Sequence, residues 1–113
     1  MLVHKGVRRF KCATIREAEV LFQAAGKTKV ELLVAMSMYG ANLDDLCAYA
    51  CIYKQHNIST LTESPEHAKL VRKKCPSLKL WIDLDPNNWH RHGIPLEQYS
   101  RIKKTAKACA DKL

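Results

Sequence analysis

The sequence predicts an α/β protein in which four strand, turn and helix units follow one another along a parallel sheet. Short apolar segments alternate with segments of helical periodicity, and helix-capping residues follow the predicted strands. The 113 residues are enough for one domain, but a (β/α)8 barrel typically needs roughly 250 residues. We therefore expect a single domain, residues 1–113, that represents part of such a barrel.

The first unit runs from a strand near Val7 to Ala13 into a helix that ends at Gly26. Thr14 can cap this helix through its hydroxyl, and Glu17 can reach back to complete a capping box. Glycine supplies the left-handed residue that commonly ends a helix. Helical spacing predicts that the buried face consists of Ile15, Ala18, Leu21, Phe22 and Ala25.

The second unit begins with a strand from Val30 to Met36, which is continuously apolar from Leu32 onward. Such a run is typical of a central strand that is covered on both faces. Asn42 can cap the following helix, and Asp44 and Asp45 lie near the positive end of its dipole. The buried stripe of this helix should comprise Leu43, Leu46, Cys47 and Ala50.

The third strand spans Ile58 to Leu61 and precedes Ser64-Pro65-Glu66, which combines an N-cap, a proline at the first helical position and an early acid. That helix ends before Pro76. The fourth strand, Leu78 to Leu84, leads into a long turn from Asp85 to Pro95. A last helix should bury Tyr99, Ile102, Ala106, Cys109 and Leu113.

The cysteines and the hydropathy pattern predict a soluble, cytoplasmic protein with reduced thiols. The N-terminal residues lack the long apolar run of a secretory signal, and no stretch of about 18 consecutive apolar residues could span a bilayer. Cys47 and Cys51 lie one helical turn apart, but no CxxC pair or well-spaced histidine completes a metal site. His90 and His92 alternate in a turn and should point apart. We expect no metal site.

Two segments carry a family resemblance. The first is Phe10-Lys11-Cys12-Ala13-Thr14-Ile15-Arg16-Glu17-Ala18-Glu19, which resembles the second-strand sequence of the D-threonine aldolase and D-serine dehydratase family. The second is Ile82-Asp83-Leu84-Asp85 together with Arg91 and Gly93-Ile94-Pro95, which is similar to the fifth-strand signature of that family. These are fold-type III pyridoxal-phosphate enzymes with an alanine-racemase-like N-terminal barrel. The resemblance implies that the four units correspond to barrel repeats two to five.

By this resemblance, the chain is part of a pyridoxal-phosphate-dependent enzyme that acts on D-amino or β-hydroxy amino acids, as an aldolase, dehydratase or racemase. The family's Schiff-base lysine lies at the end of the first barrel strand, and no residue here corresponds to it. Lys5 and Lys11 lie too close to the second-repeat strand, or within it, to replace that lysine. We therefore assign no catalytic residue and expect the chain alone to be inactive.

The resemblance assigns two residues to cofactor binding, Arg91 and Thr14. Arg91 matches the family arginine near the phenolic oxygen of pyridoxal phosphate, and a guanidinium suits that oxyanion. The alternative is that Arg91 only pairs with Asp83 or Asp85 to order the turn. Thr14 stands at a strand end and could reach the same site, although helix capping alone also explains it.

A net charge of +8 raises the alternative of a basic nucleic-acid-binding module. Two basic helical stretches, 69–74 and 101–107, carry much of this charge, but no recognition motif accompanies them, so a solvated face is the better interpretation. A third class is a non-catalytic interaction protein, because a partial barrel leaves parallel edge strands open to self-association.

Overall fold

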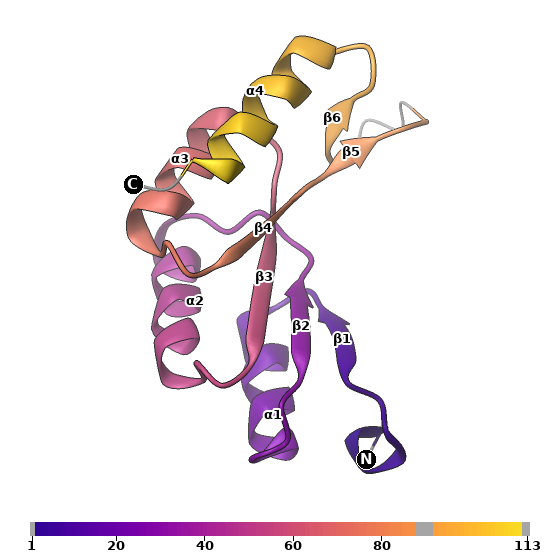
Figure 1. Ribbon diagram of the computed structural model, residues 1–113, viewed down its shortest axis with the longest axis vertical. Coiled ribbons are helices and arrows are strands. Elements are labelled where there is room, and N and C mark those ends of the chain that lie inside the picture. Colours follow the sequence, from indigo (N-terminus) through magenta and orange to yellow (C-terminus); the bar gives the residue numbers. More distant parts are fainter. Residues whose placement is uncertain (1, 88–91, 112–113) are drawn as a thin grey trace.

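The computed structural model describes residues 2–87 and 92–111 and shows an α/β chain (Figure 1). A short 3-10 helix, Leu2–Lys5, precedes the first strand. The next elements are β1 (Arg9–Cys12), α1 (Ile15–Ala25), β2 (Glu31–Val34), α2 (Gly40–Ile52), β3 (Asn57–Thr62), α3 (Pro65–Lys74) and β4 (Lys79–Ile82). The last elements are β5 (Leu84–Asp85), β6 (Ile94–Pro95) and α4 (Tyr99–Ala110). The predicted alternation of strands and helices is confirmed.

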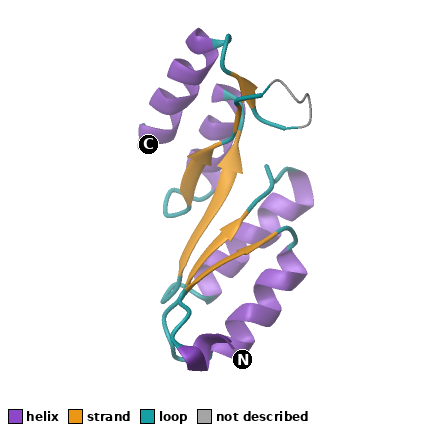
Figure 2. Cartoon of the chain, turned by 90° about the vertical axis from the view of Figure 1, so that its right-hand side faces the viewer, coloured by secondary structure: helices purple, strands orange, loops and turns teal. Residues whose placement is uncertain are grey.

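The four longer strands form one parallel sheet in the order β1, β2, β3, β4. Right-handed connections between strands in this sequential order place the connecting helices on the same face. A doubly wound sheet would instead reverse its order and carry helices on both faces. Figures 1 and 2 show α1, α2 and α3 on one side of the sheet. This arrangement is compatible with part of a (β/α)8 barrel.

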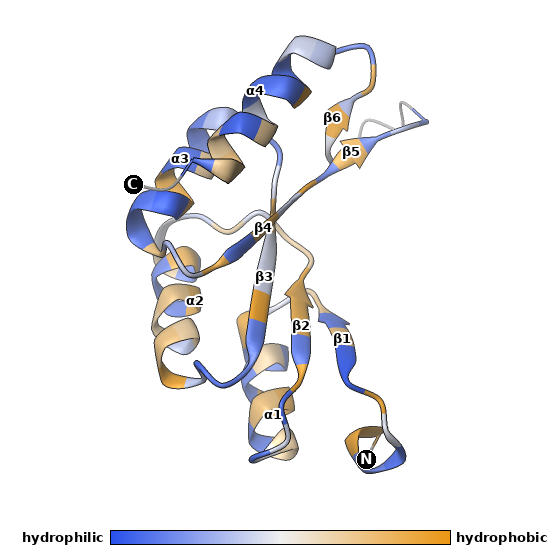
Figure 3. Cartoon of the chain, in the orientation of Figure 1, coloured by the Kyte–Doolittle hydropathy of each residue, from blue (hydrophilic) through white to orange (hydrophobic). Residues whose placement is uncertain are grey.

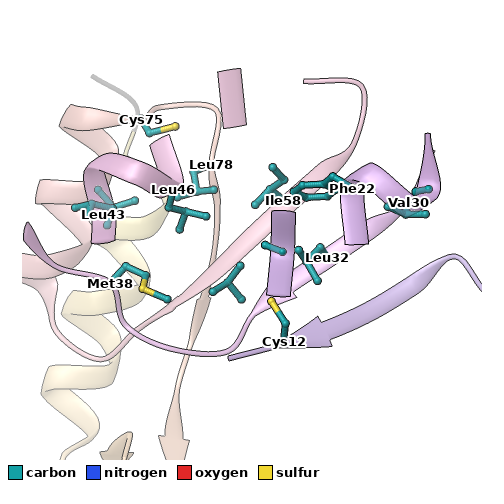
Figure 4. Close-up of a cluster of buried hydrophobic side chains, with 14 of the residues drawn as sticks. Cys12, Phe22, Val30, Leu32, Met38, Leu43, Leu46, Ile58, Cys75 and Leu78 are labelled. Carbon is teal, nitrogen blue, oxygen red and sulfur yellow. The ribbon is translucent and has the colours of Figure 1, made fainter. Parts of the chain in front are cut away.

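The hydrophobic core lies between the sheet and these helices (Figure 4). Alternate strand residues are buried, including Leu32, Val34 and Ile58. From the helices, Phe22 and Leu46 are almost fully buried against them. The predicted stripes of the first two helices are confirmed, since all of their members are buried or partly buried in this core: Ile15, Ala18, Leu21, Phe22, Ala25, Leu43, Leu46, Cys47 and Ala50.

The opposite face of the sheet carries no helix in the described part of the chain. A row of residues in register crosses it, formed by Lys11, Leu33, Ser59 and Lys79. Trp81 on β4 is 60% exposed. The sequence-based expectation that the second strand is covered on both faces is therefore wrong, although the strand is central. The physical reason is the sequential strand order, which places the connecting helices on one face only.

The first and third helix starts agree with the predicted caps. Thr14 Oγ1 accepts a hydrogen bond from Glu17 N at 3.2 Å and donates one to Glu17 Oε1 at 2.9 Å. Ser64 Oγ accepts from His67 N at 3.1 Å, and Pro65 is the first residue of α3. The bonds from Glu17 N and His67 N satisfy backbone N–H groups that the first helical turn leaves without partners. The Glu17 carboxylate accepts from the Thr14 hydroxyl, whereas the predicted capping box would have it accept from the Thr14 N–H.

The predicted cap of the second helix is wrong. The helix α2 begins at Gly40, and its N-cap residue Tyr39 makes no side-chain capping bond. Leu43 N already donates to Tyr39 O at 3.2 Å, so the first helical turn encloses Asn42. The backbone turns into the helix at Gly40, where φ is +52°, a conformation that glycine adopts without a steric penalty.

The predicted turn from Asp85 to Pro95 contains the strand β6, which pairs in parallel with β5 to form a second, two-stranded sheet. The predicted fourth strand is divided at Asp83 into β4 and β5. The carbonyl of Asp83 accepts a hydrogen bond from Ile94 N at 2.8 Å. Gly93 has a φ of +94°, and a Cβ there would lie 2.7 Å from the carbonyl carbon of Leu84. This close approach of two backbones therefore requires glycine.

A polar contact joins the helix α4 to α3 and to the start of β4. Arg72 of α3 donates through Nε to the carbonyl of Cys109 at 2.8 Å. Its Nη1 also donates to the carbonyls of Pro76, at 3.1 Å, and Leu78, at 2.5 Å. Figure 3 shows that both α3 and α4 consist largely of hydrophilic residues. A single guanidinium thus joins α4 to the start of β4.

The predicted buried stripe of the last helix is wrong at two described positions. Tyr99 is 71% exposed, Ala106 is also exposed, and the buried residues of α4 are Thr105 and Ala108. The other two described members of the predicted stripe, Ile102 and Cys109, are partly buried. Leu113 lies outside the described residues.

His56 is buried immediately before β3 and accepts a backbone hydrogen bond. Its Nδ1 accepts from Val30 N at 3.1 Å, so the neutral ring carries its proton on Nε2. The ring stacks on Phe22 with centroids 4.9 Å apart and an interplanar angle of 6°. Burial lowers the pKa of His56 below its ordinary value of 6.5, because the imidazolium would lose its hydration.

We expect His56 to make the fold less stable in acid. Its folded-state pKa lies below the unfolded value near 6.5, so between these two values the unfolded chain binds more protons. The contribution to stability is complete above pH 6.5 and is lost as the pH falls toward the folded-state pKa. Urea unfolding measured from about pH 8 to pH 5 should show this decline.

The matched variant is His56→Asn, whose amide oxygen can still accept the Val30 N–H but which does not titrate. The difference between the wild-type and variant profiles should isolate the contribution of this ring from those of the other histidines. Parallel profiles for the two proteins would contradict the assignment.

Candidate functional site

The ends of three strands surround a hollow at the carboxyl edge of the main sheet. The hollow has a volume of about 170 Å³. In parallel α/β proteins this edge is where side chains from several strands meet and where ligands bind. Its lining residues lie near the ends of β2, β3 and β4 or before β6, and they are Ala35, Met36, Ser37, Tyr39, Leu61, Glu63, Asp83 and His92.

Buried hydrogen bonds from β3 and α3 hold the loop after β2 in place. His67 Nε2 lies 2.7 Å from Met38 O, and its Nδ1 lies 2.8 Å from Thr62 Oγ1. Because a carbonyl oxygen can only accept, Nε2 carries a proton. The ring of Tyr39 packs on this imidazole with centroids 4.4 Å apart. The loop that brings Ser37 and Tyr39 to the hollow is thus held in place by the His67 ring.

Glu63 joins three segments at the strand ends. It follows β3 directly, and its Oε2 accepts a hydrogen bond from Gly93 N at 2.7 Å. Its main-chain carbonyl accepts a hydrogen bond from Arg101 Nη2 of α4 at 2.8 Å. Glu63 therefore fixes both the segment that returns to β6 and the start of α4 relative to β3.

Carboxyl groups dominate the electrostatics of the hollow. Burial raises the pKa of Asp83 above its ordinary value of 3.8, nearby Glu63 and Asp85 raise it further, and His92 opposes them. Burial also raises the pKa of Tyr39, and Glu63 acts in the same direction. Asp83 therefore retains a proton more readily than an isolated aspartate does. Such a hollow is suited to proton exchange and to cationic groups, and it disfavours anions.

The structure places only one of the two predicted cofactor-binding residues. Thr14 follows β1, at the same edge of the sheet, but it does not line the hollow. Its exposed hydroxyl both accepts from and donates to Glu17 at the start of α1. The described side-chain contacts of Thr14 are therefore those of a helix cap. Arg91 lies outside the described residues.

Glu63 and His67 belong to no motif that the sequence analysis recognised. Glu63 directly follows a predicted strand, so the rule that chemistry gathers at carboxyl ends of parallel strands could have identified it. His67 is two residues beyond Pro65, in the first turn of α3. No sequence pattern indicates that its ring bridges Thr62 and the loop after β2.

Comparison with known proteins gives no match to any family model, curated protein or solved structure. Across residues 2–87 and 92–111, no helix combines the length and apolarity that crossing a bilayer requires. Within the same residues, no group of three or more His, Cys, Asp or Glu is arranged to hold a metal ion. The described part of the chain is an α/β protein with a sequentially ordered parallel sheet. A hollow lined by two carboxyl groups lies at the carboxyl edge of this sheet.

Proposed function

We propose that the chain forms the second to fifth β/α repeats of an alanine-racemase-like barrel in a pyridoxal-phosphate-dependent enzyme. Its substrates are D-amino or β-hydroxy amino acids, and the reaction is an aldol cleavage, dehydration or racemisation. The observation that carries the proposal is the sequential order of four parallel strands with helices on one face. A (β/α)8 barrel is built in this way and keeps its chemistry at the carboxyl edge, where the hollow lies.

The described residues do not fit pyridoxal phosphate by themselves. The cofactor needs an amine for its Schiff base and cationic or N–H groups for its phosphate. None of the described side chains that line the hollow is a lysine or an arginine, and the Glu63 and Asp83 carboxylates would repel a phosphate. By the family resemblance, the lysine and the phosphate-binding loops belong to other barrel strands. The proposed role of this chain is to supply one wall of the site.

The 113-residue chain alone should therefore neither bind the cofactor at a unique position nor turn over D-threonine or D-serine. Borohydride reduction of the chain with pyridoxal phosphate should label exposed lysines to low and similar extents, as mapped by peptide mass spectrometry. Stoichiometric labelling of one lysine, accompanied by turnover, would show that the site is complete and would overturn this prediction.

The deciding test of the proposed function is the intact mass of the native protein in its source cells. A complete barrel with a second domain requires a mass roughly three times the 12.9 kDa of this chain. That larger protein should bind pyridoxal phosphate through a lysine upstream of Phe10. A native mass of 12.9 kDa would exclude the proposal.

The uncovered face of the sheet supports a second candidate, an interaction protein that associates with another copy of itself. The edge strands β1 and β4 can each pair with a further strand. The exposed Trp81 and the half-buried Leu33 line a hollow of about 290 Å³ on this face. Covering them would remove apolar surface from water. Sedimentation should then show a concentration-dependent dimer that Trp81→Ala weakens, whereas a monomer at all concentrations would exclude this candidate.

The basic helices give less support to nucleic-acid binding, because several cations already have partners within the chain. Arg72 and Arg101 donate to backbone carbonyls, and Lys74 Nζ forms an ion pair with Asp44 Oδ1 at 2.6 Å. Binding through the remaining lysines would weaken steeply with rising salt.

A further inference from the structure

A second hollow, of about 150 Å³, lies at the amino edge of the main sheet, opposite to the edge that carries the candidate functional site. It is bounded by the end of α2 and by the residues that lead into β3 and β4. The polar residues that line it are Lys54, His56, Asn57, Ser77 and Lys79. A hollow needs only roughly 10–15 Å³ to hold one water molecule, so this space admits a larger ligand.

The imidazole of His56 contributes a buried hydrogen-bond donor to the lining of this hollow. The residue is 5% exposed, and its Nδ1 accepts from Val30 N at 3.1 Å, which places the proton of the neutral ring on Nε2. Within the described part of the chain, Nε2 has no hydrogen-bond partner. Buried polar groups in folded proteins almost always have a partner, so this N–H group favours an acceptor from outside the chain.

The orientation of the ring directs Nε2 away from β2. The two nitrogens lie on opposite edges of an imidazole, and Nδ1 is bonded to Val30, which directly precedes β2. In the sheet, β2 and β4 lie on opposite sides of β3, and the hollow lies where β4 begins. Stacking of the ring on Phe22, with centroids 4.9 Å apart, holds this orientation. The N–H group without a partner is therefore on the side of the ring that faces the hollow.

The charges around the hollow suit an anion. Lys54 and Lys79 are both exposed, and neither forms an ion pair with a described residue. None of the described residues that line the hollow carries a carboxylate, whereas two carboxyl groups line the hollow at the opposite edge. The Ser77 hydroxyl and the Asn57 amide add neutral donors. The lining thus offers donors and positive charge to one ligand.

Hydrogen-bonded turns hold the segments that carry these donors. Lys54 lies within a turn that is closed by a bond from His56 N to the carbonyl three residues earlier, at 2.9 Å. Ser77 lies within a similar turn, closed by a bond from Leu78 N at 3.1 Å. The backbone on both sides of the hollow is therefore fixed before any ligand binds, which lowers the entropic cost of binding.

We propose that this hollow binds a small tetrahedral oxyanion, inorganic phosphate or sulfate, through the Nε2–H group of His56 and the ammonium groups of Lys54 and Lys79. One oxygen of the anion accepts the buried N–H group, and the others face the two lysines. A hydrogen bond to a charged acceptor is stronger than one to a neutral acceptor, so His56 favours an oxyanion over water. The site is independent of the proposed function, because it lies at the opposite edge of the sheet.

The test is to titrate the folded, nitrogen-labelled 113-residue chain with inorganic phosphate and to follow the titration by NMR. The ionic strength is kept constant with sodium chloride, at about pH 7.5, where a histidine whose pKa lies below 6.5 is neutral. We expect saturable shifts of the His56 Nε2–H resonance and of the Lys54 backbone amide. Sulfate should produce similar shifts, because the protein donates every proposed contact. Sodium chloride alone should produce none.

His56→Asn keeps an acceptor for the Val30 N–H but withdraws the Nε2–H group from the hollow. The dissociation constant for phosphate, measured from the Lys54 amide, should rise about tenfold. Lys54→Met is a second variant at an exposed position and should raise the constant roughly twofold to fivefold. Lys11→Met is its matched control, because it removes the same charge from β1, at the other edge of the sheet from β4, where salt screens its effect. It should leave the constant unchanged.

The proposal is overturned if the phosphate shifts grow without saturation or if sodium chloride produces them equally. Saturable shifts confined to the basic stretches 69–74 and 101–107, with the His56 resonance unmoved, would also contradict it. Equal weakening by Lys54→Met and Lys11→Met would mean that phosphate responds only to the net charge of the chain.

Discussion

Replacing Phe22 by alanine should lower the free energy of unfolding by about 3 to 5 kcal/mol. The side chain is 2% exposed and lies in the core between α1 and the sheet. Its ring contacts those of Tyr53 and His56, with centroids 4.9 Å from each. Alanine would remove this packing and leave a cavity that the surrounding close-packed side chains cannot fill. Urea unfolding followed by circular dichroism would measure the loss.

The matched control is Val20→Ala on the same helix, at a position that is 60% exposed. This change should alter the free energy of unfolding by no more than about 0.5 kcal/mol. Phe22→Leu keeps part of the volume and should give an intermediate loss, which makes the result interpretable if the alanine variant does not fold. Equal losses at positions 20 and 22 would contradict the packing described between α1 and the sheet.

Replacing Gly93 by alanine should cost at least about 2 kcal/mol of local stability at the strand ends. Its φ of +94° is unfavourable for any residue with a Cβ, and that atom would lie 2.7 Å from the Leu84 carbonyl carbon. The clash is with backbone, so it can be relieved only by separating β5 from β6. The hydrogen bond from Gly93 N to Glu63 should then be lost as well.

Gly6→Ala separates backbone strain from this clash. Gly6 has a similar φ, +90°, but nothing lies within 4 Å of the position that a Cβ would occupy. Hydrogen exchange at Ile94, whose N–H donates to Asp83 O, should accelerate in the Gly93 variant and stay unchanged in the Gly6 variant. Similar protection of Ile94 in both variants would mean that the two backbones do not approach as described.

The sequence predicts those parts of the fold that depend on local chemistry. Thr14 and Ser64 cap their helices as expected, because a hydroxyl before a helix satisfies backbone N–H groups wherever the helix packs. The stripes of α1 and α2 follow from helical periodicity alone. The stripe of α4 follows only in part, since Ile102 and Cys109 are partly buried but Tyr99 and Ala106 are exposed. Periodicity also does not indicate the bond from Arg72 to Cys109 O, which spans 37 positions in the sequence.

The candidate site was less predictable, because its parts belong to separate strands. Asp83 could be placed at a strand end, but the effect of burial and of Glu63 on its pKa depends on how β3 and β4 are paired. Leu33 shows the same limit in the fold. Its apolar character indicates burial, yet the sequential order of the strands leaves its side of the sheet uncovered.

The docking of α4 through Arg72 has a consequence for how cooperatively the chain unfolds. The fully buried residues of α4 are Thr105 and Ala108, and its polar attachments include the bonds from Arg72 to Cys109 O and from Arg101 to Glu63 O. Elements with few buried apolar contacts open locally at a lower free energy than the core does. The backbone amides of α4 should therefore exchange through partial opening, while those of β2 and β3 exchange only when the whole chain unfolds. We therefore expect two units of unequal stability, with the bonds of Arg72 and Arg101 setting the balance between them.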